Sequence, residues 1–168
     1  GPADYTQGAM LNFSKSNYRP SNSEPGSQGT RAHQLAMYTV FEAPFTMLCD
    51  SPSNYLAEPE CTDFIASIPT TWDETVAVDG KIAEYAAIAR RSGNTWYLGA
   101  LTNWSERDLT LDTSFLPAGN YSVEIYKDGV NADRAARDFA IEKTTHTPGS
   151  ITIHMAPGGG WVAKFVKK

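Results

Sequence analysis

Hydrophobic and polar positions along the chain follow one pattern before Pro69 and another after it. Residues 1–29 are rich in Ser, Asn, Gly and Pro, which predicts a long irregular loop. From Thr30 to Glu42 the apolar positions cover most of a helix circumference, so we expect a helix that is buried on more than one face. Pro44 then ends this helix.

A short apolar run follows the first predicted helix. Phe45–Cys49 predicts a buried strand, and Asp50–Asn54 predicts the turn beyond its carboxyl end. A second helix is expected from about Pro59 to Ser67. Helix, strand, loop and helix in this order are typical of a parallel α/β protein, in which sites form at the carboxyl ends of the strands. Residues 1–70 therefore predict a partial α/β unit.

After Pro69 the helical period gives way to short alternating or apolar runs. The expected strands are Thr75–Val78, Ile82–Ala89, Thr95–Thr102, Asp108–Leu111, Tyr121–Tyr126, Phe139–Lys143, Ile151–Met155 and Trp161–Val166. Gly, Pro, Asn and Asp separate them, as turns require. The sequence thus predicts a mainly β fold, with an antiparallel β-sandwich of about eight strands over about 100 residues.

Composition and charge narrow the class of protein. The chain has 168 residues, of which 41% are hydrophobic and 20% charged, as in an ordinary globular protein. A net charge of −5 without any run of Lys or Arg argues against nucleic acid as a partner. No apolar stretch approaches the roughly 18 residues of a membrane span, and the first residues carry no targeting signal. Cys49 and Cys61 are expected to be free thiols, with a mutual disulfide as the alternative in an exported protein.

Carboxylates in or near the first half could perform acid and base chemistry at a glycosidic bond. They are Asp4, Glu42, Asp50, Asp73 and Glu74. Asp50 directly follows the predicted strand, so it either faces a pocket or caps its own turn through Ser51. Asp4 lies beside Tyr5 and Thr6 in a polar loop that could border the same pocket, whereas Glu42 at a helix end is expected to be structural.

Other candidate chemistry is weak. His33, His146 and His154 have no His or Cys at metal-ligand spacing, so no transition-metal site is expected. Asp128, Asn131 and Asp133 lack the order of a calcium-binding loop and predict a turn instead. The run Gly158–Gly160 lacks the Lys that a phosphate-binding loop needs. Among the tryptophans, Trp104 is best placed to be exposed and is the candidate for stacking on a sugar ring.

A series of ordered blocks resembles glycoside hydrolase family 97. The first, Gly-Pro-Ala-Asp-Tyr-Thr-Gln-Gly at residues 1–8, is similar to the Gly-Pro-Met-Asp-Tyr-Thr-Pro-Gly segment of that family, with Ala3 in place of Met and Gln7 in place of Pro. Gln7 could loosen this loop. Later blocks in the same order are His33–Ala36, Asp50–Tyr55, Phe64–Ile65, Pro69–Thr70, Trp72–Thr75, Ala89–Arg91, Trp96–Thr102, Tyr126–Asp133 and Ala156–Gly160. The resemblance covers nearly the whole chain.

The resemblance implies that this chain is the C-terminal portion of a longer enzyme. Family members are α-glucosidases or α-galactosidases with an N-terminal β-sandwich, a central (β/α)₈ barrel and a C-terminal β-domain. Residues 1–70 would then be the end of the barrel and residues 71–168 the C-terminal β-sandwich. The catalytic carboxylates and the calcium ligands of the family lie upstream, so no catalytic residue and no metal ligand is expected here. Asp4, Tyr5, Thr6, Asp50 and Ser51 are expected to be neighbours of the substrate pocket.

Two hypotheses of different classes follow. In the first, the parent enzyme, periplasmic or otherwise exported, releases terminal glucose or galactose from α-linked oligosaccharides. This chain, inactive alone, then supports the barrel and contacts the other domains of the same enzyme. Its β-sandwich would cover an apolar barrel face, and exposed faces of Thr30–Phe41 and Phe45–Cys49 would favour oligomers. In the second, the β-sandwich is a stand-alone carbohydrate-binding module that holds a glycan against Trp104 or Trp96.

Overall fold

A computed structural model describes residues 2–168. The elements in chain order are β1 (Asn12–Phe13), β2 (Ser27–Gln28), α1 (Arg31–Val40), α2 (Pro52–Leu56), α3 (Pro59–Ser67), β3 (Glu74–Lys81), β4 (Tyr85–Ser92), β5 (Thr95–Thr102), β6 (Arg107–Asp112), β7 (Tyr121–Asp128), β8 (Phe139–His146), β9 (Ser150–Met155) and β10 (Gly160–Lys167). The predicted mainly β fold is confirmed, and each of the eight predicted strands after Pro69 overlaps an observed one. No helix within these residues is both long and apolar enough to cross a membrane.

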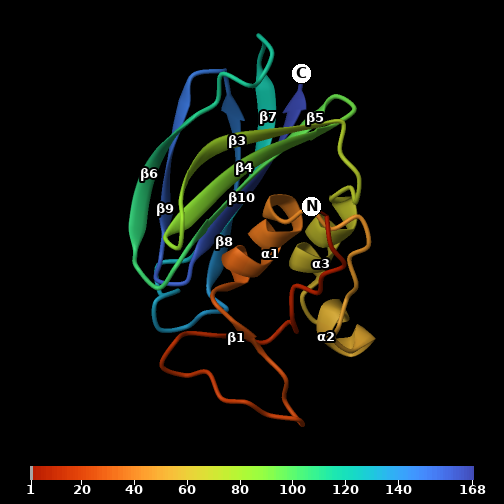
Figure 1. Ribbon diagram of the computed structural model, residues 1–168, viewed down its shortest axis with the longest axis vertical. Coiled ribbons are helices and arrows are strands. Elements are labelled where there is room, and N and C mark those ends of the chain that lie inside the picture. Colours follow the sequence, from red (N-terminus) through yellow and green to blue (C-terminus); the bar gives the residue numbers. More distant parts are fainter. Residues whose placement is uncertain (1) are drawn as a thin grey trace.

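β1 and β2 form a short parallel pair, and the strands after Pro69 form two antiparallel layers. Six of them make one sheet in the order β3-β4-β5-β10-β7-β8, and β6 pairs separately with β9. The last strand of the chain, β10, lies in the middle of the large sheet, hydrogen-bonded to β5 on one side and β7 on the other. Figure 1 shows the large sheet between the β6–β9 pair on one side and helices α1 and α3 on the other.

The space between the two sheets holds the first hydrophobic core. Alternate residues of the strands point into it, as the period of two predicts. Its fully buried members include Leu98, Leu111, Val123, Met155 and Phe165. Every residue of this core comes from residues 76–165. The β-sandwich therefore has a core of its own, which favours the predicted domain of residues 71–168.

The opposite face of the large sheet packs on the helices. Thr30 caps α1 by accepting a hydrogen bond from the amide of His33, and nine of the ten residues of α1 are buried, as the sequence predicts. Gly99 on β5 lets the helix approach the sheet closely, because a Cβ there would lie only 3.0 Å from a methyl group of Val40. In α3, the ring of Phe64 stacks on Tyr126 of β7 at 4.2 Å. Helices and sheet thus share the second core.

The predicted strand Phe45–Cys49 is wrong. Within residues 2–168 this segment makes one isolated parallel bridge, between Thr46 and Tyr5. Phe45 and Leu48 are 60% and 52% exposed. An apolar run forms a buried parallel strand only when strands on both sides satisfy its backbone groups, and here the described residues supply a neighbour on one side.

Two boundaries also differ from the expectation. Part of the predicted turn Asp50–Asn54 belongs to the short helix α2, because Ser51 accepts from the amide of Asn54 and Pro52 occupies the first turn. Strand β4 begins at Tyr85 rather than Ile82. The reason is the turn before it, where Ala83 adopts a φ of +63°.

Gly160 lies where the β9–β10 turn meets the start of α1. A Cβ at this position would overlap the backbone of His33, which belongs to the helix and has little room to move. We expect Gly160→Ala to lower the free energy of unfolding by about 2–3 kcal/mol, measured by urea denaturation. Gly80→Ala is the control, because its Cβ would meet the Tyr85 carbonyl oxygen at an ordinary 3.4 Å. Equal losses in the two variants would contradict this close approach.

Candidate functional site

The structure brings together the two segments that carry the predicted pocket residues. The segment before β1 and the segment after α1 run side by side. The amide of Met47 donates to the carbonyl of Tyr5 at 3.3 Å, and the amide of Met10 donates to Oδ2 of Asp50 at 2.7 Å. The residues Asp4–Thr6 and Asp50 therefore belong to one contiguous region of the surface.

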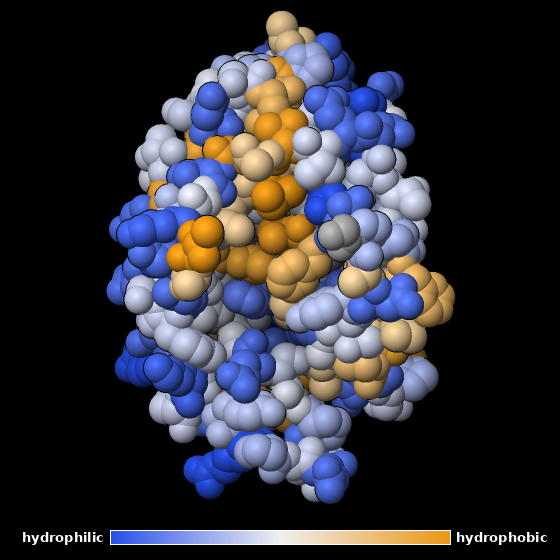
Figure 2. Space-filling model, in the orientation of Figure 1, coloured by the Kyte–Doolittle hydropathy of each residue, from blue (hydrophilic) through white to orange (hydrophobic). Residues whose placement is uncertain are grey.

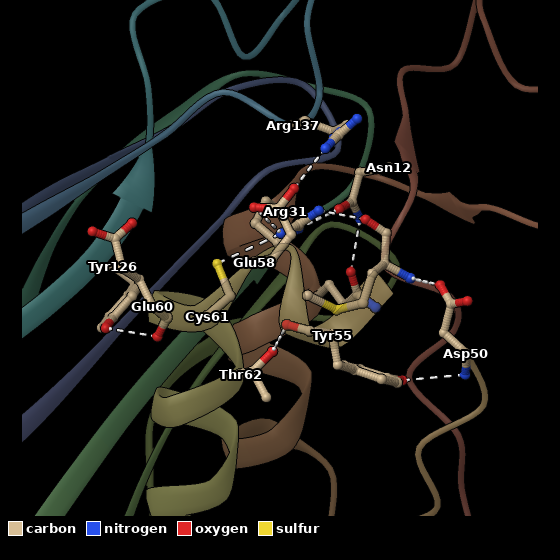
Figure 3. Close-up of polar contacts among 12 residues, drawn as sticks. Asn12, Arg31, Asp50, Tyr55, Glu58, Glu60, Cys61, Thr62, Tyr126 and Arg137 are labelled. Carbon is tan, nitrogen blue, oxygen red and sulfur yellow. Dashed lines mark hydrogen bonds and ion pairs between the residues drawn. The ribbon is translucent and has the colours of Figure 1, made fainter. Parts of the chain in front are cut away.

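Asp50 organises its own turn and also holds the neighbouring segment. Its Oδ1 accepts from the amide of Ser51 and from Nδ2 of Asn54, each at 2.7 Å, while Oδ2 accepts from Met10 (Figure 3). Partial burial acts to raise the pKa of this carboxyl, but the three hydrogen bonds outweigh it and hold the pKa below its usual value. The turn-capping interpretation is thus confirmed. A place beside the substrate stays a prediction for both Asp50 and Ser51.

Asp4, Tyr5 and Thr6 lie on the surface. The Tyr5 hydroxyl lies 3.9 Å from the sulfur of Met37, and its ring meets Phe41 edge-on at 4.9 Å. Tyr5 is therefore fixed against the carboxyl end of α1, although 40% of it remains exposed. The role of these three residues as pocket neighbours stays a prediction.

Gln34 of helix α1 forms hydrogen bonds with the segment from Gly8 to Asn12. Its Nε2 donates to the carbonyls of Gly8 and Ala9, each at 3.0 Å, and its Oε1 accepts from Nδ2 of Asn12 at 3.0 Å. Gln34 is 1% exposed and Asn12 is 5% exposed. Every polar atom of the Gln34 amide is thus used to hold the chain that leads from the predicted pocket segment into β1.

Arg31 is a fully buried cation that sequence reasoning did not single out. Its Nε donates to Oδ1 of Asn12 at 2.6 Å, its Nη2 donates to the carbonyl of Met10, and its Nη1 lies 3.3 Å from a carboxylate oxygen of Glu58 (Figure 3). Glu58 in turn accepts from Arg137 at 2.5 Å. The available signal was the position of Arg31 at the start of a helix with apolar residues all round, because a buried guanidinium needs acceptors close by.

Asp128 joins the β-sandwich to the start of α1. Its Oδ1 accepts from the Thr30 hydroxyl at 2.5 Å, and its Oδ2 accepts from the amides of Ala156 and Gly160 at 2.8 and 3.2 Å. Burial raises the pKa of Asp128 to about 6 against the opposing effect of these hydrogen bonds. Sequence reasoning placed Asp128 only in a turn and missed this role.

Metal binding finds no support among the residues that the structure describes. They contain no group of three or more His, Cys, Asp or Glu side chains that could hold an ion. The residues after Asp128 form turns, as predicted, and the amide of Asn131 donates to Asp138 at 2.8 Å. Cys49 and Cys61 are both free thiols, the first exposed and the second buried.

The two tryptophans that the binding-module hypothesis assigns to sugar stacking, Trp96 and Trp104, are not fully exposed. Trp96 is 3% exposed and belongs to the core between the sheets, so it is wrong as a sugar-stacking residue. Trp104 is half-buried, and its ring lies against Gly158, where a Cβ would overlap it. Stacking of Trp104 on a sugar stays a prediction, with its ring already in contact with the β9–β10 turn.

An open groove lies instead beside β9. It has a volume of about 970 Å³ and is lined by β7, β8, β9 and the loop after β7. Ile151 contributes half-buried apolar surface, whereas Ile125 and Ile153 are only 4% and 3% exposed, and Lys127 is paired with Glu142 at 2.6 Å. The one tryptophan among its lining residues, Trp161, is only 3% exposed. The groove can therefore offer polar and aliphatic contacts.

Comparison with known families and proteins places both halves of the chain. Residues 71–166 match the family described as "Glycosyl-hydrolase 97 C-terminal, oligomerisation". A retaining alpha-galactosidase of Bacteroides thetaiotaomicron is 57% identical over 98% of this chain. A probable retaining alpha-galactosidase of Streptomyces bingchenggensis is 27% identical over 97%. The chain spans 25% and 23% of these two relatives, about a quarter of their length.

Solved structures give the same relationship. A glycoside hydrolase family 97 enzyme from a Pseudoalteromonas species, in complex with acarbose, matches 83% of this chain with a TM-score of 0.78 and 35% identity. A beta-arabinopyranosidase matches 87% with a TM-score of 0.68 and 29% identity. In each case the matched part is 23% of the solved chain.

Proposed function

Since this chain belongs to glycoside hydrolase family 97, we propose that it forms the end of the catalytic barrel and the C-terminal β-domain of a retaining α-galactosidase. The parent enzyme would release terminal α-linked galactose from oligosaccharides. The observation that carries this proposal is that one relative named for that activity aligns with both halves of the chain, the helical part and the β-sandwich together. We further propose that the parent works outside the cytoplasm.

The surface of the helical part supports a place inside a larger barrel. Six large hydrophobic side chains of residues 2–70 are at least 38% exposed, one of them Leu56 in α2. The other five lie before β1 and after α1 and are named here the apolar patch: Tyr5, Phe41, Phe45, Met47 and Leu48. Figure 2 shows hydrophobic surface gathered along the middle of this face of the molecule. Contiguous apolar surface of this kind is typical of an interface. The rest of the barrel is the proposed partner of the apolar patch.

Two polar side chains, Gln7 and Asp50, also support a place inside a larger barrel. Gln7 is 2% exposed, and neither polar atom of its side chain has a hydrogen-bond partner within residues 2–168. A buried amide left in this way costs about 1–3 kcal/mol, so a neighbouring segment or a water molecule is expected to satisfy it. Asp50 is already engaged by three donors, which suits a residue that shapes a pocket. The acid, the nucleophile and any calcium ligands are proposed to lie in the rest of the enzyme.

The apolar patch gives a differential test. Phe45→Ser and Leu48→Ser are expected to change the unfolding of this 168-residue chain by less than about 0.5 kcal/mol, since both side chains face water. In the parent each is expected to cost about 1.5–3 kcal/mol, because burial against the barrel would be lost. Ile82→Ser, at a position that is 98% exposed in the β-domain, is the control and should change neither. Equal effects in the two proteins would contradict the proposal.

Activity and assembly provide the second part of the test. The isolated chain should not hydrolyse an aryl α-galactoside, while the parent should. Because the apolar patch lacks its partner in isolation, light scattering should give a mass above the 18.3 kDa monomer, and the Phe45→Ser/Leu48→Ser double variant should shift it toward the monomer. The family description includes oligomerisation. A monomeric wild-type chain would count against the apolar patch as an interface.

The groove beside β9 favours carbohydrate binding as a second candidate function. Its threonine hydroxyls and paired charges could hydrogen-bond to sugar hydroxyls, and the half-buried Ile151 could pack under a ring. Calorimetry with galacto-oligosaccharides tests this function, and Trp104→Ala tests the alternative site. Binding that persists in Trp104→Ala but is lost in Ile151→Ser would favour the groove.

A further inference from the structure

A chain of charged and polar contacts leads from the β-sandwich to the predicted pocket segment. It begins at Arg137, in the loop between β7 and β8, which donates to Glu58 at 2.5 Å. Glu58 lies 3.3 Å from Arg31, and Arg31 donates to the carbonyl of Met10 and to Asn12. We name these contacts the arginine relay. Figure 3 shows Arg137, Glu58, Arg31 and Asn12 following one another across the junction of the helices.

The middle of the arginine relay is protected from water. The side chain of Arg31 is 0% exposed and that of Glu58 is 20% exposed, whereas Arg137 is 55% exposed. Desolvation acts to raise the pKa of Glu58, but the Arg137 hydrogen bond and the charges of both arginines hold the pKa below its usual value. Glu58 is therefore ionised at neutral pH and attracts two cations at once. Charge-assisted hydrogen bonds in such surroundings are stronger than those on an open surface.

The far end of the arginine relay is the loop that carries the predicted pocket residues. Arg31 donates to the carbonyl of Met10 and to Asn12, and the backbone N–H of the same Met10 donates to Asp50. A shift at Met10 thus moves one of the three donors of Asp50. The loop continues without interruption back to Asp4–Thr6. The relay therefore connects an exposed arginine of the β-sandwich to both predicted pocket segments.

We propose that Arg137 is a positioning residue for the loop from Asp4 to Asn12, which carries predicted pocket residues. Arg137 acts through Glu58 and then through Arg31, which contacts Met10 and Asn12. In this way the β-domain contributes to substrate affinity in addition to covering the helices. The effect on affinity rests on the proposed function, whereas the effect on the loop does not.

Hydrogen exchange of the 168-residue chain tests the effect on the loop. Arg137→Gln is expected to speed exchange of the Met10 amide about tenfold, and Glu58→Gln by at least as much, because each removes a charge-assisted contact from the relay. Arg137→Lys should restore most of the protection. Arg134→Gln is the matched control, since Arg134 lies in the same loop but pairs with Asp133. Exchange at Ala100 in the central sheet reports global unfolding, so the acceleration at Met10 must exceed any acceleration at Ala100 in the same variant.

Kinetics of the parent enzyme test the effect on affinity. Arg137→Gln should raise KM about threefold or more and leave kcat within twofold, with recovery in Arg137→Lys. A purely structural defect would instead reduce the folded fraction, which lowers the apparent kcat and leaves KM unchanged.

The outcomes distinguish the effect of Arg137 on the loop from its effect on substrate affinity. Unchanged exchange at Met10 in Arg137→Gln would overturn the inference, whatever Glu58→Gln or the kinetics show. Faster exchange with unchanged KM would overturn the role in substrate affinity while leaving the proposed function in place. A wild-type parent without α-galactosidase turnover would overturn the proposed function and leave the effect on the loop standing.

Discussion

Asp128→Ala is expected to lower the free energy of unfolding by about 3 kcal/mol at pH 7. The substitution removes the shared acceptor of the Thr30 hydroxyl and of the Ala156 and Gly160 amides, all at the junction of α1 with the sheet. Equilibrium urea denaturation measures the change. Asp133→Ala is the control, because Asp133 is 53% exposed in the same loop and should change stability by less than about 0.5 kcal/mol. A comparable loss of stability in both variants would contradict the role of Asp128 in connecting α1 to the sheet.

The same variant predicts a pH dependence. The pKa of Asp128 is about 6 in the folded chain against 3.8 for an ordinary Asp. The folded state therefore binds the proton more tightly than the unfolded state, and protonation of Asp128 stabilises the fold. The proton-linked part of the Asp128 contribution is therefore complete below about pH 4 and is lost as the pH rises through 6, and it adds to the hydrogen-bond contribution that remains at pH 7. The stability difference between wild type and Asp128→Ala should widen by on the order of 2 kcal/mol between pH 7.5 and 4.5. A difference that narrows in acid would contradict this sign.

Arg31→Met is expected to cost about 3–5 kcal/mol, the largest single effect in the chain. Methionine replaces the aliphatic part of the side chain but leaves Glu58, Asn12 and the Met10 carbonyl without their buried donor. The denaturation midpoint should fall, with a folded spectrum retained at low urea. Arg91→Met is the control, because Arg91 pairs with Asp73 and Glu74 at the surface and should cost less than about 1 kcal/mol.

The pH dependence of Arg31→Met should have the opposite sign to that of Asp128→Ala. The pKa of Glu58 lies below its ordinary 4.5, so its contribution is present above that pH and is lost as the pH falls through the folded value. The deficit of Arg31→Met should therefore shrink in acid. A deficit that stays constant from pH 7 to pH 3 would contradict the ion pair as its source.

The strands could be predicted from the sequence, but their order could not. Short apolar runs place β5 and β10 as strands, and alternation of apolar residues places β7. Nothing in these patterns says that β10 inserts between the other two, because neighbours in a sheet are chosen by long-range packing. The predicted strand Phe45–Cys49 fails for a related reason, since an apolar run is also what an interface with a missing partner looks like.

The candidate site was predicted only in part. Asp50 could be placed because its position after an apolar run and its neighbour Ser51 both indicate a turn. The partners of Arg31 and Asp128 could not be, since they come from segments between 19 and 98 residues away along the chain. No local pattern encodes such contacts. A buried charge nevertheless leaves one readable trace, which is an ionisable residue inside an otherwise apolar stretch.

The central place of β10 has a consequence for synthesis on the ribosome. The chain emerges with α1 first, yet that helix packs on β5 and β10, and β10 is made more than 100 residues later. Until β10 leaves the exit tunnel, β5 and β7 have no common neighbour, and α1 can rest only on the β4–β5 half of its sheet surface. Such long-range closure slows folding. Because β10 is the last of these strands to be made, the two halves of the large sheet, β3-β4-β5 and β7-β8, can be joined only after nearly all of residues 2–168 have been synthesised.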